Sequence, residues 1–430
     1  MSTHAPRVLV LGGTEMSTRT AAACGLTVVN IEKPGLFEPG AKAHCEQTHL
    51  VDYQNIDLVT ILAQTLHQRE PFTKVFSQTE AGPLVAGHLT TALGLQGNGA
   101  DVTRLLHDKL ALRTCLNARG IGNVAAEQGC SREMLRAFVA RHGAAVVKPT
   151  MGSGSLGVRK VLSPAQVAET WDWLSSFGMD DFMVEELLVG AELSVETFSV
   201  AGRHSVVAIT GKDNGDGVVA LGHVVPAALS RQQKSAVVDM TLRMLDAVGL
   251  VEGPAHTELI LTPEGPRIVE SHNRCAGGHI NELVNMVYGI DLEQLTYRLA
   301  LPPEPLQVTA PARGAAAVRF LVSPVGRVES VEGIEEARAV PGVVKVDVKV
   351  EPGQDARPLR WSEDRAGAVI ARAESTEAAN RSTRQAVDLI HIRTCPPEQL
   401  PSTTMTNVLA SVNEVLDPFA DAADTAQRLA

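Results

Sequence analysis

Glu258 and Glu270 stand in two short apolar stretches of the segment HTELILTPEGPRIVESHNR, and paired carboxylates can act together on one ligand. The alternation of apolar and polar residues predicts two strands joined by a tight turn. If the turn closes around Glu264, Leu261 faces Arg267 and the two glutamates lie opposite each other on one face.

Opposed side chains of a strand pair have Cβ atoms about 4.5–5.5 Å apart, where like charges repel. Either one carboxyl group takes a proton or a cation lies between Glu258 and Glu270. Carboxylate oxygens suit Mg²⁺, which usually arrives with the phosphates of a substrate. The alternatives are a solvated polar face or a strand register shifted by one residue.

The segment AAVVKPTMGSGSLGV, residues 144–158, combines a lysine with a glycine-rich loop. Its β-branched run places Lys148 at the end of a strand, and Pro149 ends the strand ladder. Glycines in such a loop let backbone N–H groups approach an anion, and serines add hydroxyl groups. The spacing is not that of a Walker loop. The residues that would hold phosphate are Gly152, Ser153, Gly154, Ser155 and Gly157.

Lys109 interrupts an apolar stripe in the segment DVTRLLHDKLALRTCL. Helical periodicity puts Leu105, Lys109, Leu112 and Leu116 on one face of a single helix. A lysine on such a face either extends its amine to solvent or meets an anion.

The segment VEELLVGAELSVETFSV predicts a strand, a turn and the first strand of a hairpin that closes about Gly202. Period-two alternation puts Glu192, Ser194 and Glu196 on one face. This face either meets a ligand or is a structural surface on which Glu192 pairs across the hairpin with Lys212.

The order of predicted elements indicates an α/β and α+β protein of several domains. Residues 1–100 alternate strands and helices as an open parallel sheet does, and the turn GGTEMS lacks the third glycine of a dinucleotide site, which favours a structural turn. A mixed α+β region over 101–300 follows, then a proline-rich boundary at 301–314. We expect an α+β domain over 314–398 and a tail over 399–430.

The composition restricts the class of partner. The 430 residues carry a net charge of −11 without a basic stripe, and aromatic residues make up only 3%. Neither feature suits nucleic acid or an anionic membrane. The six cysteines form no CxxC pair, and the apolar run VLVLGG is too short for a signal peptide or a membrane span. We expect a cytoplasmic protein with reduced thiols.

Taken in order, Lys109, Lys148 before its glycine loop, VEELLVGAE, Glu258 and ESHNRCAGG resemble the ATP-grasp superfamily. Within it, the chain resembles the carboxylate–amine ligases related to L-amino-acid (dipeptide) ligases, over roughly residues 7–395. The resemblance implies an ATP-grasp architecture, with a Rossmann-like open sheet before the ATP-grasp domain and an α+β domain after it.

The resemblance also implies a nucleotide site. Lys109 and Lys148 would contact the phosphates of ATP, and the loop from Gly152 to Gly157 would close over them. Glu192 would hold the ribose hydroxyls. The hinge beside the adenine would be formed by Glu185, Glu186 and Leu188.

Glu258 and Glu270 would bind Mg²⁺, with Mn²⁺ as an alternative, and Arg274 would face the transferred phosphoryl group. The usual ending E-x-N-x-R here reads Glu270-Ser-His272-Asn273-Arg274, so histidine holds the asparagine position. Histidine is a poor Mg²⁺ ligand. The third ligand is then Asn273, reached through a local bulge, or the metal is held differently.

The resemblance implies that ATP activates a small carboxylate as an acyl phosphate, which a second, amine substrate captures with release of ADP and phosphate. Lys148 and Arg274 would be the catalytic cations. Two alternatives remain: a carboxylase on the same scaffold, although no biotin-accepting MKM is present, and a non-catalytic ATP-binding module. The identities of the two substrates and the oligomeric state are not readable from the residues.

Overall fold

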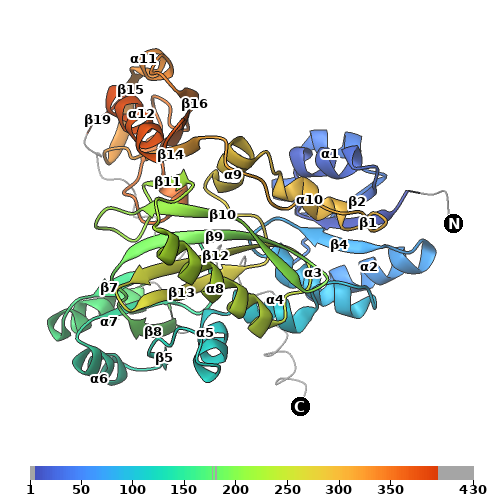
Figure 1. Ribbon diagram of the computed structural model, residues 1–430, viewed down its shortest axis with the longest axis horizontal. Coiled ribbons are helices and arrows are strands. Elements are labelled where there is room, and N and C mark those ends of the chain that lie inside the picture. The colour runs from blue at the N-terminus through green and yellow to red at the C-terminus, as the bar shows by residue number, and fades with distance from the viewer. Residues whose placement is uncertain (1–4, 177, 180–181, 396–430) are drawn as a thin grey trace.

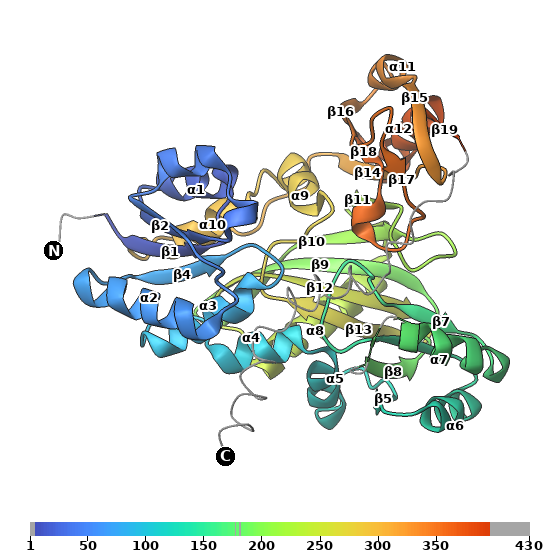
Figure 2. The same ribbon diagram turned by 180° about the vertical axis from the view of Figure 1, so that it is seen from behind.

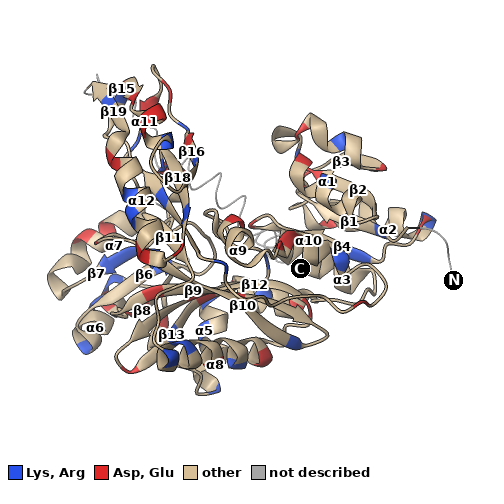
Figure 3. Ribbon diagram, turned by 45° about the horizontal axis from the view of Figure 1, so that its top comes forward, with Lys and Arg blue, Asp and Glu red and all other residues tan. Residues whose placement is uncertain are grey.

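The computed structural model describes residues 5–176, 178–179 and 182–395, and Figure 1 shows its three parts. The predicted tail over 399–430 lies outside the described residues. Figure 2 shows the N-terminal part on one side of α9 and the C-terminal part on the other. Lys, Arg, Asp and Glu are interspersed over all three parts in Figure 3.

The N-terminal part is the open parallel sheet that the sequence predicts. Its strand order is β3-β2-β1-β4, with β1 at Arg7–Leu11, β2 at Thr27–Glu32, β3 at Gln47–Leu50 and β4 at Lys74–Ser77. The helices are α1 at Glu15–Ala23, α2 at Ile56–Arg69 and α3 at Gly82–Ala92. Strands buried on both faces read as continuous apolar runs, as VLVL does here.

The glycine turn after β1 is filled by the protein itself. Gly12 has φ of +69°, and a Cβ there would lie 2.3 Å from Cγ2 of Thr79. Glycine is therefore required at this position of the turn, because both its backbone angle and the side chain of Thr79 disfavour a Cβ.

The central part contains two sheets. The smaller is antiparallel, in the order β5-β8-β6-β7, with β5 at Ala126–Gly129, β6 at Ala145–Pro149, β7 at Arg159–Val161 and β8 at Phe182–Glu186. Helices α6 (Arg132–His142) and α7 (Val167–Ser176) accompany it. Their apolar faces share one core with the strands, centred on Phe138, Val147 and Phe182.

The larger sheet has the order β13-β12-β9-β10-β11-β14-β18-β16 and links the central part to the C-terminal part through β11 and β14. The strands that the central part contributes to this sheet are β9 at Ala191–Val200, β10 at Arg203–Asp213, β11 at Gly222–Val225, β12 at Gly253–Thr262 and β13 at Gly265–His272. Helix α8 (Arg231–Val248) packs across β12 and β13 (Figure 1).

The apolar stripe around Lys109 is not one helix, which corrects the sequence prediction. Helix α4 covers Ala100–His107 and α5 covers Lys109–Ala118. Asp108 between them is extended, and its side chain accepts the N–H of Ala111 as the N-cap of α5. Lys109 therefore starts a helix.

Helices α9 (Ile280–Tyr288) and α10 (Leu292–Arg298) return the chain toward the N-terminal sheet. Tyr297 of α10 is fully buried against Phe76, and its hydroxyl lies 2.6 Å from the hydroxyl of Ser17 on α1. Packing of α10 against α1 thus ties the end of the central part to the first sheet.

The C-terminal part contains mixed strands and helices. Its strands are β14 at Ala315–Leu321, β15 at Gly326–Glu332, β16 at Val343–Val348, β17 at Asp355–Ala356, β18 at Gly367–Ala373 and β19 at His391–Cys395. Its α-helices are α11 (Ile334–Arg338) and α12 (Thr376–Leu389).

Short 3₁₀ turns occur in all three parts of the chain, at Pro34–Leu36, Pro39–His44, Pro164–Gln166 and Ser362–Asp364. Within the described ranges, none of the helices has the length and apolar character needed to cross a membrane.

Candidate active site

Two pockets meet at the acidic pair. One of about 420 Å³ lies between the smaller sheet and the larger sheet. The other, of about 940 Å³, extends from the larger sheet toward the C-terminal part. Both are lined by Glu258, Glu270, Lys212, Ser153 and Ser155. The two pockets therefore adjoin at these carboxylates.

The hairpin that carries the pair has a tighter turn than the sequence suggested. Thr262 pairs with Gly265, so the loop contains only two residues. Leu261 consequently opposes Pro266, and the predicted pairing of Leu261 with Arg267 is wrong by one residue.

A β-bulge nevertheless puts Glu258 opposite Glu270, as predicted. Leu259 pairs with Ile268, so the extra residue in β13 is Val269, which has no partner across the hairpin. A regular ladder from this turn would place Val269 opposite Glu258 and direct Glu270 to the other face of the sheet. The bulge therefore creates the paired carboxylates.

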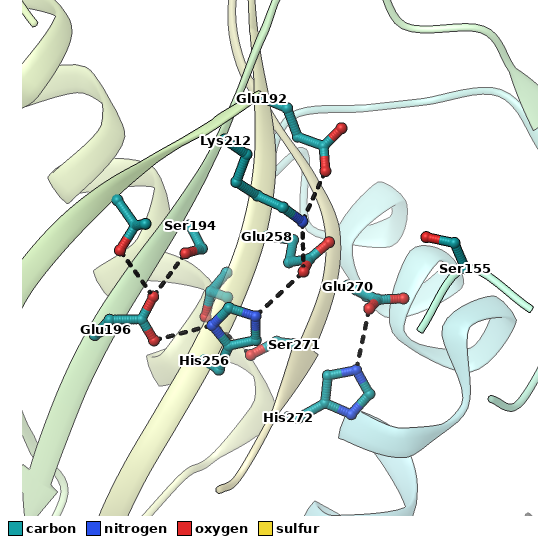
Figure 4. Close-up of polar contacts among 12 residues, drawn as sticks. Ser155, Glu192, Ser194, Glu196, Lys212, His256, Glu258, Glu270, Ser271 and His272 are labelled. Carbon is teal, nitrogen blue, oxygen red and sulfur yellow. Dashed lines mark hydrogen bonds and ion pairs between the residues drawn. The ribbon is translucent and has the colours of Figure 1, made fainter. Parts of the chain in front are cut away.

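Glu258 is neutralised by Lys212 on the adjacent β10 hairpin (Figure 4). The Lys212 Nζ lies 2.7 Å from Glu258 Oε1 and 2.7 Å from Glu192 Oε1, so the structural pairing of Glu192 with Lys212 is present. Burial disfavours the Glu258 carboxylate, but Lys212 and His256 outweigh burial and hold its pKa well below the usual range. The same two glutamates outweigh burial at Lys212 and raise its pKa.

Glu270 has its own cation. Lys109 Nζ lies 3.2 Å from Glu270 Oε2 and also donates to the carbonyl oxygen of Gly152. His272 Nε2 lies 3.3 Å from Glu270 Oε1. Burial opposes ionisation of Glu270, yet Lys109 and His272 keep its pKa well below the usual range. Lys109 is thus buried against an anion, and does not extend to solvent.

A buried network behind Glu258 includes a residue that the sequence analysis missed, His256 (Figure 4). His256 Nε2 lies 3.2 Å from Glu258 Oε1, and its Nδ1 lies 2.9 Å from Glu196 Oε2. The hydroxyl of Ser194 donates to Glu196 Oε1 at 2.6 Å. Burial disfavours protonation of His256, but Glu196 and Glu258 raise its pKa to about 9. Its position two residues before Glu258, on the same strand face, was the available signal.

Lys148 also lies in a buried ion cluster. Its Nζ is 2.5 Å from Glu185 Oε1, and Arg113 Nη2 is 3.2 Å from Glu185 Oε2. Burial opposes ionisation of Glu185, but Lys148 and Arg113 lower its pKa. Arg113, on the inner face of α5, had no local signal in the sequence. The three side chains carry one net positive charge, which leaves Lys148 able to serve a phosphate.

The glycine-rich loop between β6 and β7 is closed by contacts from two other segments. Ser155 Oγ donates to the carbonyl oxygen of Val218 at 2.9 Å. The Ser362 N–H donates to the carbonyl oxygen of Gly154 at 3.0 Å, and a Cβ on Gly154 would lie 2.6 Å from Ser362 Oγ. The loop therefore contacts the C-terminal part directly.

Arg274 lies in the larger pocket and forms an ion pair with Glu80, which follows β4 of the N-terminal part. Burial opposes the Glu80 carboxylate, but Arg274 and His272 lower its pKa. Arg274 Nη1 also donates to the carbonyl oxygen of Cys275 at 2.9 Å. Glu80 is a third residue that the sequence analysis missed, after His256 and Arg113, because its partner is remote in the chain.

The structure brings most predicted site residues together. The smaller pocket is lined by Lys109, Lys148, Gly152, Ser153, Ser155, Glu185, Glu186, Leu188, Glu192, Glu258 and Glu270. Gly154 and Arg274 line the larger pocket. Gly157 and Asn273 line neither, and Asn273 instead lines two other cavities, one beside Glu252 and one beside Glu80 and His272. The side chain beside the acidic pair is that of His272.

Comparison with known proteins agrees with this arrangement. Residues 142–282 match the ATP-grasp domain family, and residues 319–394 match the L-amino acid ligase C-terminal domain 2. The chain is 29% identical over 368 residues to the protein y4rH of Sinorhizobium fredii, covering 83% of this chain and 75% of that protein. It is 24% identical over 305 residues to the L-arginine-specific L-amino acid ligase of Bacillus subtilis, covering 66% and 71%.

The L-amino acid ligase of Bacillus licheniformis has a similar structure, with a TM-score of 0.78 at 20% identity over 92% of this chain and all of that chain. The biotin carboxylase domain of the 2-oxoglutarate carboxylase of Hydrogenobacter thermophilus scores 0.67 at 16% identity, over 95% and 94%. These structural likenesses show the fold alone.

Residues 142–282 therefore form an ATP-grasp domain, within an overall fold like that of the L-amino acid ligase of Bacillus licheniformis. The chain as a whole resembles the L-amino acid ligases, and its residues 319–394 match a C-terminal domain of theirs.

Proposed function

We propose that the chain is an ATP-dependent carboxylate–amine ligase that forms an amide bond, with amino acids as substrates, through an acyl phosphate. The observation that carries the proposal is the position of Glu258 and Glu270, where a pocket lined by lysines and a glycine loop meets a larger pocket. The likeness to L-amino acid ligases supports it.

The two carboxylates fit a magnesium ion, because oxygen ligands of this kind suit Mg²⁺. Glu258 and Glu270 would hold it, and Mn²⁺ is an alternative. When bound, it would neutralise phosphate charge and orient ATP. Lys109 and Lys212 now neutralise the same carboxylates, and with nucleotide present Lys109 would turn to phosphate oxygens. Asn273 is left out of this proposed ligand set, because it lines neither of the two pockets that the pair lines.

ATP is needed because an ionised carboxylate repels an amine and its oxygen is a poor leaving group. Phosphorylation converts that oxygen into part of a phosphate that leaves readily. Lys148 and Arg274 would stabilise charge on the migrating phosphoryl group from the two pockets. The loop around Gly154 would exclude water, which otherwise hydrolyses an acyl phosphate.

The hinge residues would position the base and sugar of ATP. Glu185, Glu186 and Leu188 follow each other along the edge of the smaller pocket. Glu192, at the start of β9, would accept hydrogen bonds from the ribose hydroxyls.

The test is a screen of amino-acid pairs with Mg²⁺ and ATP for phosphate release, followed by mass spectrometry of the products. We expect ADP, phosphate and an amide. Glu270→Gln should lower turnover about a hundredfold or more, because it removes a ligand of the metal that the transition state requires. Glu264→Gln, in the exposed turn of the same hairpin, is the matched control and should keep full activity.

Formation of AMP and pyrophosphate would refute the acyl-phosphate route. ADP formation that requires bicarbonate and biotin in place of two amino acids would favour the carboxylase alternative. Tight ATP binding without turnover of any pair would favour a binding module.

A further inference from the structure

Arg365 lies in the wall that the C-terminal part contributes to the larger pocket, just before β18. Its guanidinium carbon lies 3.7 Å from the centroid of the Phe320 ring. Its Nε and Nη2 donate to the carbonyl oxygen of Ala220 at 3.1 and 2.8 Å. A stacked ring on one side and a carbonyl group on another hold the guanidinium in a defined orientation.

Arg365 forms no ion pair with a carboxylate within the part of the chain that the structure describes. Other arginines around it do: Arg319 pairs with Asp213 at 2.9 Å, and Arg360 pairs with Asp364 at 3.1 Å. Arg274, in the same pocket, is paired with Glu80. Arg365 is therefore a cation that is held in position without an ion-paired carboxylate among the described residues.

Partial burial makes that unmatched charge unfavourable. Burial lowers the pKa of Arg365 to about 10, partly offset by Glu363, so the guanidinium remains charged at neutral pH. A partly desolvated cation without a counter-ion raises the free energy, which a bound anion would lower. Lys349 lines the same pocket and adds a second positive charge, while Glu363 is exposed at its rim.

Arg365, Glu258 and Glu270 line one pocket, so a single substrate there can lie between the guanidinium and the acidic pair. Glu258 lies on β12, and Phe320, on which Arg365 stacks, lies four strands further across the sheet on β14. His223 of β11 lies between, and the charges of both Arg365 and Glu258 act on its pKa after the larger effect of burial.

We propose that Arg365, assisted by Lys349, binds the carboxylate of the amine substrate. The amine that captures the acyl phosphate is then that of an amino acid or peptide, and an uncharged amine is a poor substrate. A planar guanidinium suits a planar carboxylate, because its Nη edge offers two parallel donors. The inference rests on the proposed ligase function.

In the step concerned, the amine nitrogen forms a bond to the acyl carbon and the bond from that carbon to the phosphate oxygen breaks. Phosphate leaves with the electron pair, and the nitrogen loses a proton. Arg365 takes no part in this exchange. It is a binding residue that aligns the nitrogen by holding the other end of the molecule.

The experiment separates the two half-reactions. Hydroxylamine captures an acyl phosphate as a hydroxamate without needing the carboxylate site, so it identifies the acid and measures its activation alone. The second half-reaction is then measured with an amino acid and with the amide of the same amino acid. The ratio of the rate with the amino acid to the rate with its amide is compared between the wild-type protein and a variant. The different intrinsic reactivities of the two amines cancel in this comparison.

We expect Arg365→Gln to raise KM for the amino acid about 10- to 100-fold, the loss typical of a charge-assisted hydrogen bond. Hydroxamate formation and KM for ATP should stay within about threefold. Wild-type protein should prefer the amino acid to its amide by a similar factor, and the variant should not discriminate. Arg365→Lys should restore part of the preference, whereas Arg372→Gln, on the exposed side of β18, is the matched control and should change nothing.

Equal use of the amide and the amino acid by wild-type protein overturns the inference, and it needs no variant. An unchanged KM in Arg365→Gln overturns it as well. If no acid gives ADP or hydroxamate, the proposed ligase function itself is wrong. If hydroxamate forms but the protein does not distinguish the amino acid from its amide, only the role of Arg365 is wrong.

Discussion

Replacing Glu185 by glutamine would test the buried ion cluster that holds Lys148. The Glu185 carboxylate lies 2.5 Å from Lys148 Nζ and 3.2 Å from Arg113 Nη2, and the three side chains are at most 5% exposed. Glutamine keeps the shape of the side chain and removes its charge. Two cations are then left buried without a carboxylate.

The expected cost is about 3–5 kcal/mol in the free energy of unfolding, the range for removing one partner of a buried ion pair. The lysine and arginine both lose their counter-ion here, so the upper half of the range applies. Glu186→Gln is the matched control. Among the described residues its carboxylate accepts one hydrogen bond, from the backbone N–H of Ala125 at 3.2 Å, and it is more exposed, so about 1 kcal/mol is expected.

Urea unfolding of the wild-type protein and both variants measures these differences. The folded-state pKa of Glu185 lies below its unfolded value, so its contribution is fully present above about pH 4.3 and is lost as pH falls through the folded pKa. The gap between wild type and Glu185→Gln should therefore close in acid. Equal stability of the Glu185→Gln and Glu186→Gln variants at pH 7 would refute the reasoning.

The remaining predictions concern the loop and the metal. Gly154→Ala puts an alanine at a positive φ against Ser362, which costs about 1–2 kcal/mol in free energy, so kcat/KM for ATP should fall about tenfold. Gly143→Ala is the control, because Gly143 also has a positive φ but has open space around its Cβ, and it should leave the ATP kinetics unchanged. His272→Ala should raise the Mg²⁺ concentration for half-maximal activity about tenfold, because partners of ligating carboxylates tune metal affinity. Asn273→Ala should leave this Mg²⁺ concentration within about twofold of the wild-type value. Both values come from a Mg²⁺ titration of ATP turnover, and a larger effect of Asn273→Ala than of His272→Ala would contradict this geometry.

Several site features were predictable because they depend on neighbours along the chain. A β-branched run followed by proline and glycines places Lys148 at a strand end before a loop, whatever packs around it. Period-two alternation likewise put Glu192, Ser194 and Glu196 on one face. These patterns, taken in order, also carried the resemblance to the ATP-grasp superfamily.

Other features were decided by the tertiary structure. The turn of the β12–β13 hairpin is one residue tighter than the pattern suggested, and only the bulge at Val269 brings Glu258 back opposite Glu270. The extended Asp108 divides a stripe that periodicity alone reads as a single helix. In both places a local pattern allows two backbone paths of similar quality, and packing against the rest of the protein selects one.

The amino-acid sequence by itself determined the strands and the glycine-rich loop around the candidate site, and which of their residues could hold phosphate or metal. Only the tertiary structure decided the partners of those residues. Arg113 meets Glu185, Glu80 meets Arg274, and Arg365 lines the larger pocket without an ion pair to any described carboxylate. Charges so far apart in the chain interact only after folding removes them from water and fixes their distances, and neither quantity is written in a local pattern.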